Sequence, residues 1–262
     1  MLKRIQYTKR SIIRLFSVIC LAVTLQACTS SDKFHQATVI PDPLEPVNRA
    51  VLQFNTGLDI ILIEPLSSAY IFLLPEVVRD SVQNFFRNLR SPLYVANNVL
   101  QGDFGDAGVG AARFVINSTV GVGGLFDVAA NQGLGFESED FGQTLASWGV
   151  GDGFYIVWPI LGPSSLRDSV GSFADSTANP WRILAFARDE EALYFIGSGV
   201  EALDQRSRLL TSIRDLRGNS LDYYSSLKSV YEQRRSAVIS DSVYTNNFDI
   251  PNYSYEYEEF DE

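Results

Sequence analysis

Cysteine and histidine are almost missing from this chain of 262 residues, which has two cysteines and one histidine. Cys20, Cys28 and His35 all lie near the N-terminus. The rest of the chain therefore offers no thiol for a disulfide, and no Ser-His-Asp or Cys-His arrangement for catalysis. No zinc, copper or other metal site is expected either. A packed core has to hold the fold, and the apolar content of 46% is sufficient for one.

Basic residues are also scarce, with 21 Lys and Arg against 31 Asp and Glu. Five of the basic residues lie within the first 14 positions, and without them the net charge is −15. Nucleic acid is not an expected partner, because binding to phosphates relies on clustered Lys and Arg. Electrostatic attachment to an anionic membrane is not expected for the same reason. Any membrane affinity must come from apolar insertion and an anchor.

The N-terminus predicts such an anchor. A basic start precedes the apolar run Leu15–Leu25, which is of signal-peptide length, and Ala27 stands directly before Cys28. This arrangement resembles the lipobox of bacterial lipoproteins. We interpret residues 1–27 as a signal peptide that is removed, Cys28 as the lipid-bearing N-terminus, and residues 28–41 as a lipidated tether. The alternative of a transmembrane anchor is disfavoured, because about 11 apolar residues do not span ~30 Å of hydrocarbon.

Helical spacing of apolar residues dominates residues 42–240, which predicts one mostly α-helical domain. Val47–Leu58 and Glu76–Arg90 each carry one apolar face. Ser91-Pro92 is expected to end the second of these helices, and Pro92–Gln101 to form another short one. The run Leu58–Pro75 is the most apolar, but two acids and a proline interrupt it, so a full bilayer span is not expected. Residues 241–262 are acidic, Tyr-rich and without periodicity, and are interpreted as a disordered tail.

Residues 149–163 differ from the rest. Gly149, Gly151 and Gly153 alternate before a β-branched and aromatic run, and Pro159 and Gly162 follow it. This pattern favours an irregular hairpin over a helix.

The sequence shows no catalytic apparatus, so no enzymatic activity and no cofactor are predicted. Glu137, Glu139 and Asp140 are spaced for a carboxylate pair, yet carboxylates directly before a helix are more often caps. The apolar faces allow two interpretations: they pack inside the domain, or they lie in a membrane interface. Packing is favoured for Val78, Phe85 and Leu89. Both remain open for residues 60–63 and 71–74.

A series of motifs resembles the MlaA (VacJ) family of outer-membrane lipoproteins. The matching residues run from Asp42 to Asn179 and are Asp42-Pro43-Leu44-Glu45, Asn48-Arg49, Phe54-Asn55, Leu74-Pro75, Arg79, Asn84-Phe85, Asn88-Leu89, Asn98, Leu100-Gln101-Gly102, Arg113-Phe114, Asn117, Gly121, Gly123-Gly124, Asp127-Val128-Ala129, Phe141-Gly142-Gln143-Thr144-Leu145, Gly149-Val150-Gly151, Gly153, Tyr155, Pro159, Gly162, Leu166-Arg167-Asp168 and Asp175. The resemblance implies an all-α, ring- or disc-like domain with amphipathic helices in the periplasmic leaflet of the outer membrane. It also implies transport of misplaced phospholipid from the outer leaflet, through a central channel, to a soluble periplasmic carrier. Association with trimeric porins is implied as well.

Two site hypotheses follow. We expect the hairpin to lie at the mouth of the channel, with Gly149, Gly151, Gly153, Pro159 and Gly162 as its hinges. Arg113 and Arg167 are candidates for contact with lipid head groups, although ordinary salt bridges are the simpler interpretation of both. Two other functions stay open: a structural adaptor that binds porins without moving lipid, and a lipid-degrading enzyme, which the missing His and Cys make the weakest.

Overall fold

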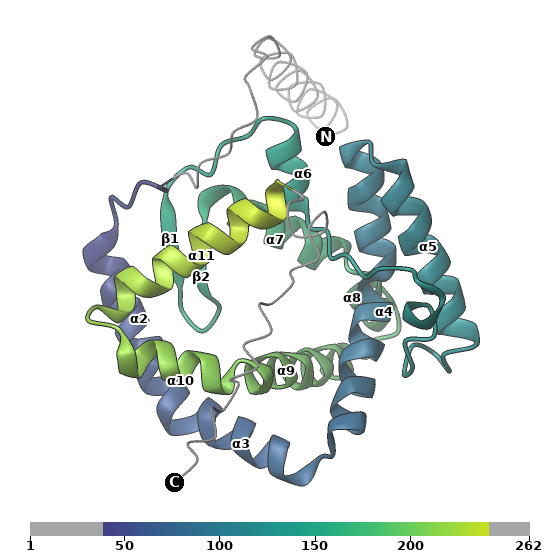
Figure 1. The fold of residues 1–262 in the computed structure, drawn as a ribbon, viewed down its shortest axis with the longest axis horizontal. Coiled ribbons are helices and arrows are strands. Elements are labelled where there is room, and N and C mark those ends of the chain that lie inside the picture. The colour runs from purple at the N-terminus through teal and green to yellow at the C-terminus, as the bar shows by residue number, and fades with distance from the viewer. Residues whose placement is uncertain (1–38, 241–262) are drawn as a thin grey trace, which may run out of the picture. The chain divides into compact units, whose positions relative to one another are not determined.

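The computed structural model describes residues 39–240, and these are mostly helical (Figure 1). The elements in chain order are α2 (Glu45–Leu58), η2 (Asp59–Ile63), α3 (Glu64–Leu73), α4 (Glu76–Gln101), α5 (Phe104–Thr119), η3 (Ala130–Gln132), α6 (Phe141–Ser147), β1 (Tyr155–Trp158), β2 (Gly162–Ser165), α7 (Leu166–Ala178), α8 (Pro180–Ala187), α9 (Glu191–Arg208), α10 (Leu210–Asn219) and α11 (Tyr223–Ile239). The expected all-α class is confirmed, with one short pair of strands. Cys28, residues 29–38 of the predicted tether and the acidic tail lie outside the described residues. Ile40, which was assigned to the tether, is buried in the core instead.

The described helices form a ring (Figure 1). Its contacts can be followed in a closed circuit, from α2 through α3, α9, α4, α6 and α11 to the strands β2 and β1, and back to α2. The predicted ring- or disc-like shape is therefore confirmed. The helix α5 packs along the outside of α4, and α10 connects α9 to α11.

The elements α2, η2 and α3 form one continuous helical segment of 29 residues, Glu45–Leu73. The middle element, η2, is a π-helix, and Pro65 lies in the first turn of α3 directly after it. Because Pro65 has no N–H to donate, this is a place where regular α-helical hydrogen bonding has to change. The segment is long and apolar enough to cross a membrane by length and composition alone. Asp59 and Glu64 in this segment bind α9 and α10, as described below, so one of its faces belongs to the ring.

The helix α4 corrects a prediction. It continues through Pro92 for 26 residues, where two helices were expected. A proline inside a helix costs about 3 kcal/mol, because it removes a hydrogen bond and crowds the preceding turn. The packing of α4 against α5, α6, α8 and α9 offsets that cost.

The predicted hairpin exists, but it is shorter than expected. Its strands are antiparallel, with Tyr155 opposite Ser165 and Trp158 opposite Gly162. The segment 149–154 precedes the hairpin and is held by the neighbouring helices, through a backbone hydrogen bond from Val150 to Leu145 and another from Leu166 to Phe154. The alternating β-branched and aromatic pattern begins only at Tyr155, so the strand begins there.

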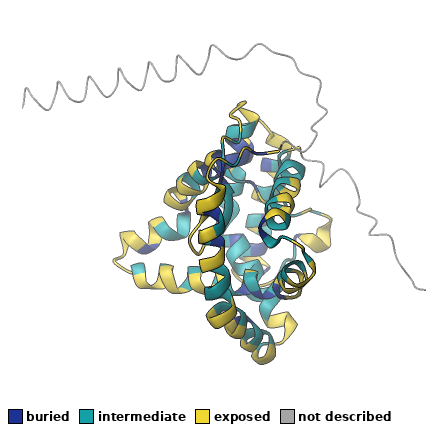
Figure 2. Cartoon of the chain, turned by 90° about the vertical axis from the view of Figure 1, so that its left-hand side faces the viewer, coloured by how far each residue is buried: buried dark blue, intermediate teal, exposed yellow. Residues whose placement is uncertain are grey.

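The apolar core is small and lies between the hairpin, α2 and α11. It consists of Ile40, Leu52, Tyr155, Val157 and Tyr224. Among the described residues, buried polar side chains outnumber buried apolar ones, and many large apolar side chains are exposed. This is the reverse of the usual distribution in a soluble domain. Figure 2 shows that buried positions are scattered over short stretches of the chain.

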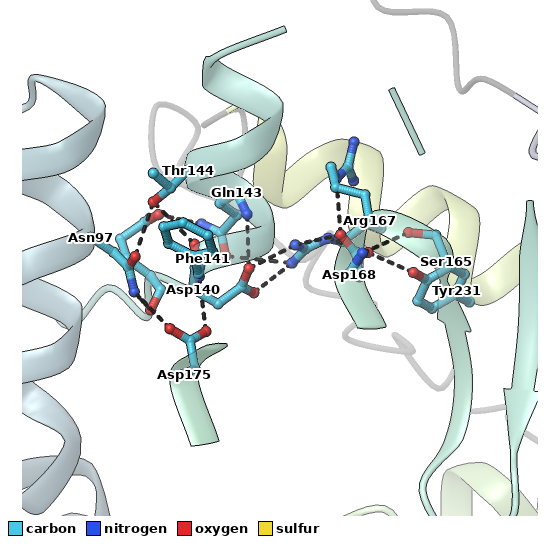
Figure 3. A network of polar contacts seen from close by, with 12 residues as sticks. Asn97, Asp140, Phe141, Gln143, Thr144, Ser165, Arg167, Asp168, Asp175 and Tyr231 are labelled. Carbon is cyan, nitrogen blue, oxygen red and sulfur yellow. Dashed lines mark hydrogen bonds and ion pairs between the residues drawn. The ribbon is translucent and has the colours of Figure 1, made fainter. Parts of the chain in front are cut away.

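A polar network connects α11 to the helices α6 and α7 (Figure 3). The Arg235 guanidinium binds both Asp140 and Asp168, with its shortest contacts at 2.6 Å and 2.8 Å. Tyr231 donates a hydrogen bond to Asp168 at 2.6 Å, and the Asp140 side chain caps α6. These contacts join the last helix to the middle of the chain, so they help to close the ring.

Candidate functional site

A cavity of about 440 Å³ lies inside the ring. The volume falls within the range of pockets that bind small molecules. The hairpin and the helices α2, α3, α9, α10 and α11, together with η2, contribute its walls. Its lining residues are Leu52, Asn55, Thr56, Asp59, Ile63, Leu66, Ile160, Gly162, Pro163, Gly199, Ala202, Leu203, Arg206, Ile213, Arg217, Tyr223 and Leu227. Most of the wall is apolar, and the charged lining residues are one aspartate and two arginines.

The charged part of the wall is a cross-link between elements. Arg206 of α9 binds Asp59 of η2 through two hydrogen bonds, from Nε and Nη2, both of 2.8 Å. Arg217 of α10 reaches Asp59 at 3.3 Å and Glu64 of α3 at 2.6 Å. Arg214 binds the other oxygen of Glu64 at 2.6 Å. Asp59 and Glu64 are the two acids that interrupt the apolar run in the sequence.

These ion pairs affect the acid–base properties of the groups. Hydrogen bonds from Arg217 and Arg214 hold the pKa of Glu64 below its usual value. The hydrogen bond to Glu64 raises the pKa of Arg217. Glu64 and Arg217 therefore carry their charges at neutral pH, and the ion pairs give the apolar cavity a charged patch on one wall.

The tip of the hairpin forms another part of the wall. Ile160 lines the cavity and has a φ of 68°, in the left-handed region that β-branched residues avoid. The side chain of Asn55 on α2 holds this turn. Its amide nitrogen donates to the carbonyl of Trp158 at 2.9 Å, and its oxygen accepts from the Ile160 N–H at 2.8 Å.

The predicted hinge residues are placed differently from one another. Gly162 lines the cavity, with a φ of 87°. Gly149, Gly151 and Gly153 lie in the segment before the hairpin. Of these three, Gly149 and Gly153 have a positive φ. Gly153 lies against Leu166 so closely that a Cβ there would be 2.9 Å from the Leu166 Cβ. The structure does not test whether any of these positions moves, so the hinge role stays a prediction.

The two candidate head-group arginines are buried and paired within the protein. Arg113 binds Asp127 through two contacts of 2.7 Å and 2.9 Å. Arg167 binds Asp152 at 2.7 Å and Asp168 at 3.0 Å. Neither residue lines the 440 Å³ cavity. These positions agree with the salt-bridge interpretation, and head-group contact by either residue stays an untested hypothesis.

The carboxylates before α6 have structural contacts. Asp140 caps the helix by accepting from the Gln143 N–H and also binds Arg235. Glu139 accepts a hydrogen bond from Gln101 at 2.7 Å. Over residues 39–240 no group of three or more His, Cys, Asp or Glu is placed to hold a metal ion.

Large apolar side chains are exposed on the surface of η2, α3 and the start of α4. Ile61 is 79% exposed and Phe72 is 87% exposed. Other large apolar side chains on η2, α3 and the start of α4 are exposed as well, namely Ile60, Leu62, Leu66, Leu73 and Val77. Of the residues for which both interpretations were open, Ile60, Ile61, Leu62, Phe72 and Leu73 are exposed. Val78, for which packing inside the domain was favoured, is exposed as well, at 43%.

A family model described as "MlaA lipoprotein" matches residues 40–238, which include the whole ring. The chain belongs to the MlaA lipoprotein family. The Escherichia coli K12 protein named "Intermembrane phospholipid transport system lipoprotein MlaA" is 34% identical over 85% of this chain and 87% of its own length. A protein of Rickettsia bellii is 35% identical over 80% of each chain.

A solved structure from work on the "structural basis for maintenance of bacterial outer membrane lipid asymmetry" has the same fold. The TM-score is 0.67, and the match covers 76% of this chain and 98% of the other, at 35% identity. The MlaA family is one of transport lipoproteins, which agrees with the prediction of a function other than catalysis.

Sequence reasoning missed the ion-pair cluster. Asp59 and Glu64 were visible as interruptions of an apolar run, but their partners lie about 150 residues later in the chain. A useful signal was the composition of the basic residues: outside the leader only Lys33 and Lys228 are lysine, and arginine is suited to bidentate pairs.

Proposed function

We propose that this protein is a lipid-anchored component of retrograde phospholipid transport in the outer membrane. It takes phospholipid that has strayed into the outer leaflet and passes it through the ring to a soluble periplasmic carrier, which maintains lipid asymmetry. The observation that carries the proposal is the apolar cavity with one ionised patch, inside a ring whose surface exposes large apolar side chains.

The physical reason for such a passage is the cost of moving a head group through hydrocarbon. A polar or charged group without partners in an apolar medium is strongly disfavoured. A cavity with charged side chains on one wall supplies partners for the head group, and its apolar residues supply a surface for the acyl chains. The transported lipid needs no chemical change, so no cofactor is required.

The exposed apolar residues of η2 and α3 also explain how the protein would attach to a membrane. We infer that the exposed apolar residues of η2 and α3 lie among the acyl chains of the periplasmic leaflet, and that the lipid on Cys28 adds a second anchor. With a net charge of −15 after removal of the leader, attraction to anionic lipids is not available. Trimeric porins and a soluble lipid carrier are the proposed protein partners, and the family resemblance supports both.

The test is to delete the gene and restore it on a plasmid. Outer-leaflet phospholipid and sensitivity to detergent are measured alongside porin assembly. We expect the deletion to raise outer-leaflet phospholipid and detergent sensitivity, and the plasmid to reverse both. A change in porin assembly alone would establish the adaptor function instead. Release of free fatty acid by the purified protein would establish an enzyme.

Native mass spectrometry of the detergent-extracted protein gives an independent check. Intact phospholipid is expected to co-purify with it. A protein that never carries phospholipid, in a strain where deletion leaves outer-leaflet phospholipid unchanged, would contradict the transport proposal.

A further inference from the structure

The cavity wall holds more positive than negative charge. The charged lining residues are Arg206, Arg217 and Asp59. Within residues 39–240 the ion pairs of Arg206, Arg214 and Arg217 are with Asp59 and Glu64, so the cluster has a surplus of one positive charge. The chain as a whole is strongly acidic. Placing ions beside an apolar cavity does not by itself stabilise a fold, because the cost of desolvation offsets much of the attraction. A surplus of guanidinium groups at this place therefore points to an anionic ligand.

Arg217 lines the cavity and shares both of its carboxylate partners with other arginines. Its contact with Asp59 is long, at 3.3 Å, and the same oxygen of Asp59 already accepts from Arg206 at 2.8 Å. Its second contact is with Glu64, which Arg214 also binds. The Arg217 side chain is 23% exposed, against 13% for Arg206. An incoming anion can thus replace the contacts of Arg217 without leaving either carboxylate unpaired.

Arg206 offers a further donor. Its Nη1 is buried and has no hydrogen-bond partner among the described residues. An unpaired buried donor is costly, and a guanidinium presents its donors in a planar fork that fits a phosphate. The surplus charge, the shared partners of Arg217 and the unpaired nitrogen of Arg206 are found at one wall of one cavity.

Building on the proposed transport function, we propose that Arg217 and Arg206 form a subsite for the phosphate of the phospholipid, in which the phosphate takes the place of the Asp59 and Glu64 carboxylates at Arg217. The acyl chains lie against the apolar wall formed by residues such as Ile63, Leu66 and Leu203. The two acids act as competitors. They keep the arginines paired when the cavity holds no lipid, and they weaken phosphate binding so that the lipid can leave again.

The test compares binding of three probes to the full-length lipidated protein in neutral detergent, by native mass spectrometry. The probes are dihexanoyl phosphatidylglycerol, dihexanoylglycerol without a phosphate, and inorganic phosphate. The variants are Arg217→Gln and Asp59→Asn, and Arg188→Gln serves as a control because Arg188 is exposed and lies outside the cavity. Thermal melting by circular dichroism checks that each variant is folded.

We expect the original protein to bind the phosphatidylglycerol at least tenfold more tightly than the diacylglycerol. Arg217→Gln is expected to reduce this preference about tenfold, or ~1.4 kcal/mol. Asp59→Asn is expected to change binding in the opposite direction, because it removes a competing carboxylate. Opposite effects of two neighbouring substitutions distinguish a binding site from a merely structural ion pair. Should Asp59→Asn fail to fold, Arg217→Gln still decides, because it leaves Asp59 paired with Arg206 and Glu64 with Arg214.

Equal binding of the two lipids to the original protein, or an unchanged preference in Arg217→Gln, would overturn the phosphate subsite while leaving lipid transport intact. Binding of neither lipid would count against the transport function itself. Binding of inorganic phosphate shows whether the subsite recognises the phosphate of a phospholipid or free phosphate. We expect inorganic phosphate to bind weakly to the original protein and not at all to Arg217→Gln. If inorganic phosphate bound as tightly as the phospholipid, the acyl chains would contribute nothing, and this would overturn a lipid site.

Discussion

Asn55 holds the tip of the hairpin with both ends of its amide. The conformation that it fixes is unfavourable, because Ile160 is β-branched and has a positive φ, a strain of roughly 1–3 kcal/mol. The turn therefore depends on two hydrogen bonds from one side chain to stay against the cavity.

This dependence gives a prediction for one residue. Asn55→Leu, which keeps the volume and removes both hydrogen bonds, is expected to raise the hydrogen-exchange rate of the Ile160 amide about tenfold. The expected loss of overall stability is only about 1 kcal/mol. Gln53→Leu is the control, because Gln53 lies on the same helix and is exposed. Equal exchange at Ile160 in both variants would contradict the role of Asn55.

Asp168 gives a second prediction, which concerns pH. Burial raises the pKa of Asp168, but the charge of Arg235, the hydrogen bond from Tyr231 and the charge of Arg167 outweigh burial and hold the pKa below its usual value. A carboxyl group whose pKa is lowered by folding stabilises the fold above its unfolded pKa, which is about 3.9, and this contribution is lost as the pH falls through the folded value.

We expect the melting temperature of the original protein to fall steeply below about pH 4. Asp168→Asn is expected to be less stable at pH 7, by about 3 kcal/mol, because it breaks a buried ion-pair network. Its decline at low pH should be shallower, since the titrating group is gone. Melting curves between pH 2.5 and 7 measure both effects, and parallel declines in the two proteins would show that other carboxylates dominate.

At the scale of the element, the segment before the hairpin is where movement was predicted. Gly149 has a φ of 86°, so alanine there costs about 1 kcal/mol, whereas the site of a Cβ at Gly151 is open. Gly149→Ala combined with Gly151→Ala is therefore expected to leave the protein folded. If these positions are hinges, outer-leaflet phospholipid should accumulate in cells that carry the double variant. Gly108→Ala in α5 is the control, because it also meets no neighbour within 4 Å. Normal lipid removal by the double variant would exclude the hinge role.

Local patterns predicted the helices well where periodicity was strong, as in α2 and the first part of α4. They failed at Pro92, because the tertiary packing that offsets a proline inside a helix involves elements that are distant in sequence. The hairpin was expected six residues too early, because the three alternating glycines were included in it although they form the loop before it. For the candidate site, the acids of the cluster were visible, but their arginine partners depend on ring closure and were not.

At the scale of the whole molecule, the exposed apolar residues of η2 and α3 predict a membrane-facing surface. Ile61→Glu combined with Phe72→Glu places two charges there and touches no core residue, since both side chains are largely exposed. We expect the purified variant to melt as the original does, and to bind liposomes at least tenfold more weakly when lipidation is absent from both proteins. Glu substitutions at Val39 and Leu221, which are exposed on other parts of the molecule, are the control. If both pairs of substitutions weakened binding to liposomes equally, η2 and α3 would have no special role in membrane binding.

The circuit of contacts has a consequence for how the protein is made. The backbone N–H of Ile40 donates to Glu232, Arg49 binds Asp222, and Tyr224 donates to Asp42, so the first and last described parts of the chain join each other. If the chain emerges starting from its N-terminus, the segment at Ile40 waits for about 190 residues before its partner helix α11 arrives. The exposed apolar residues of η2 and α3 are therefore synthesised well before the contacts that close the ring can form.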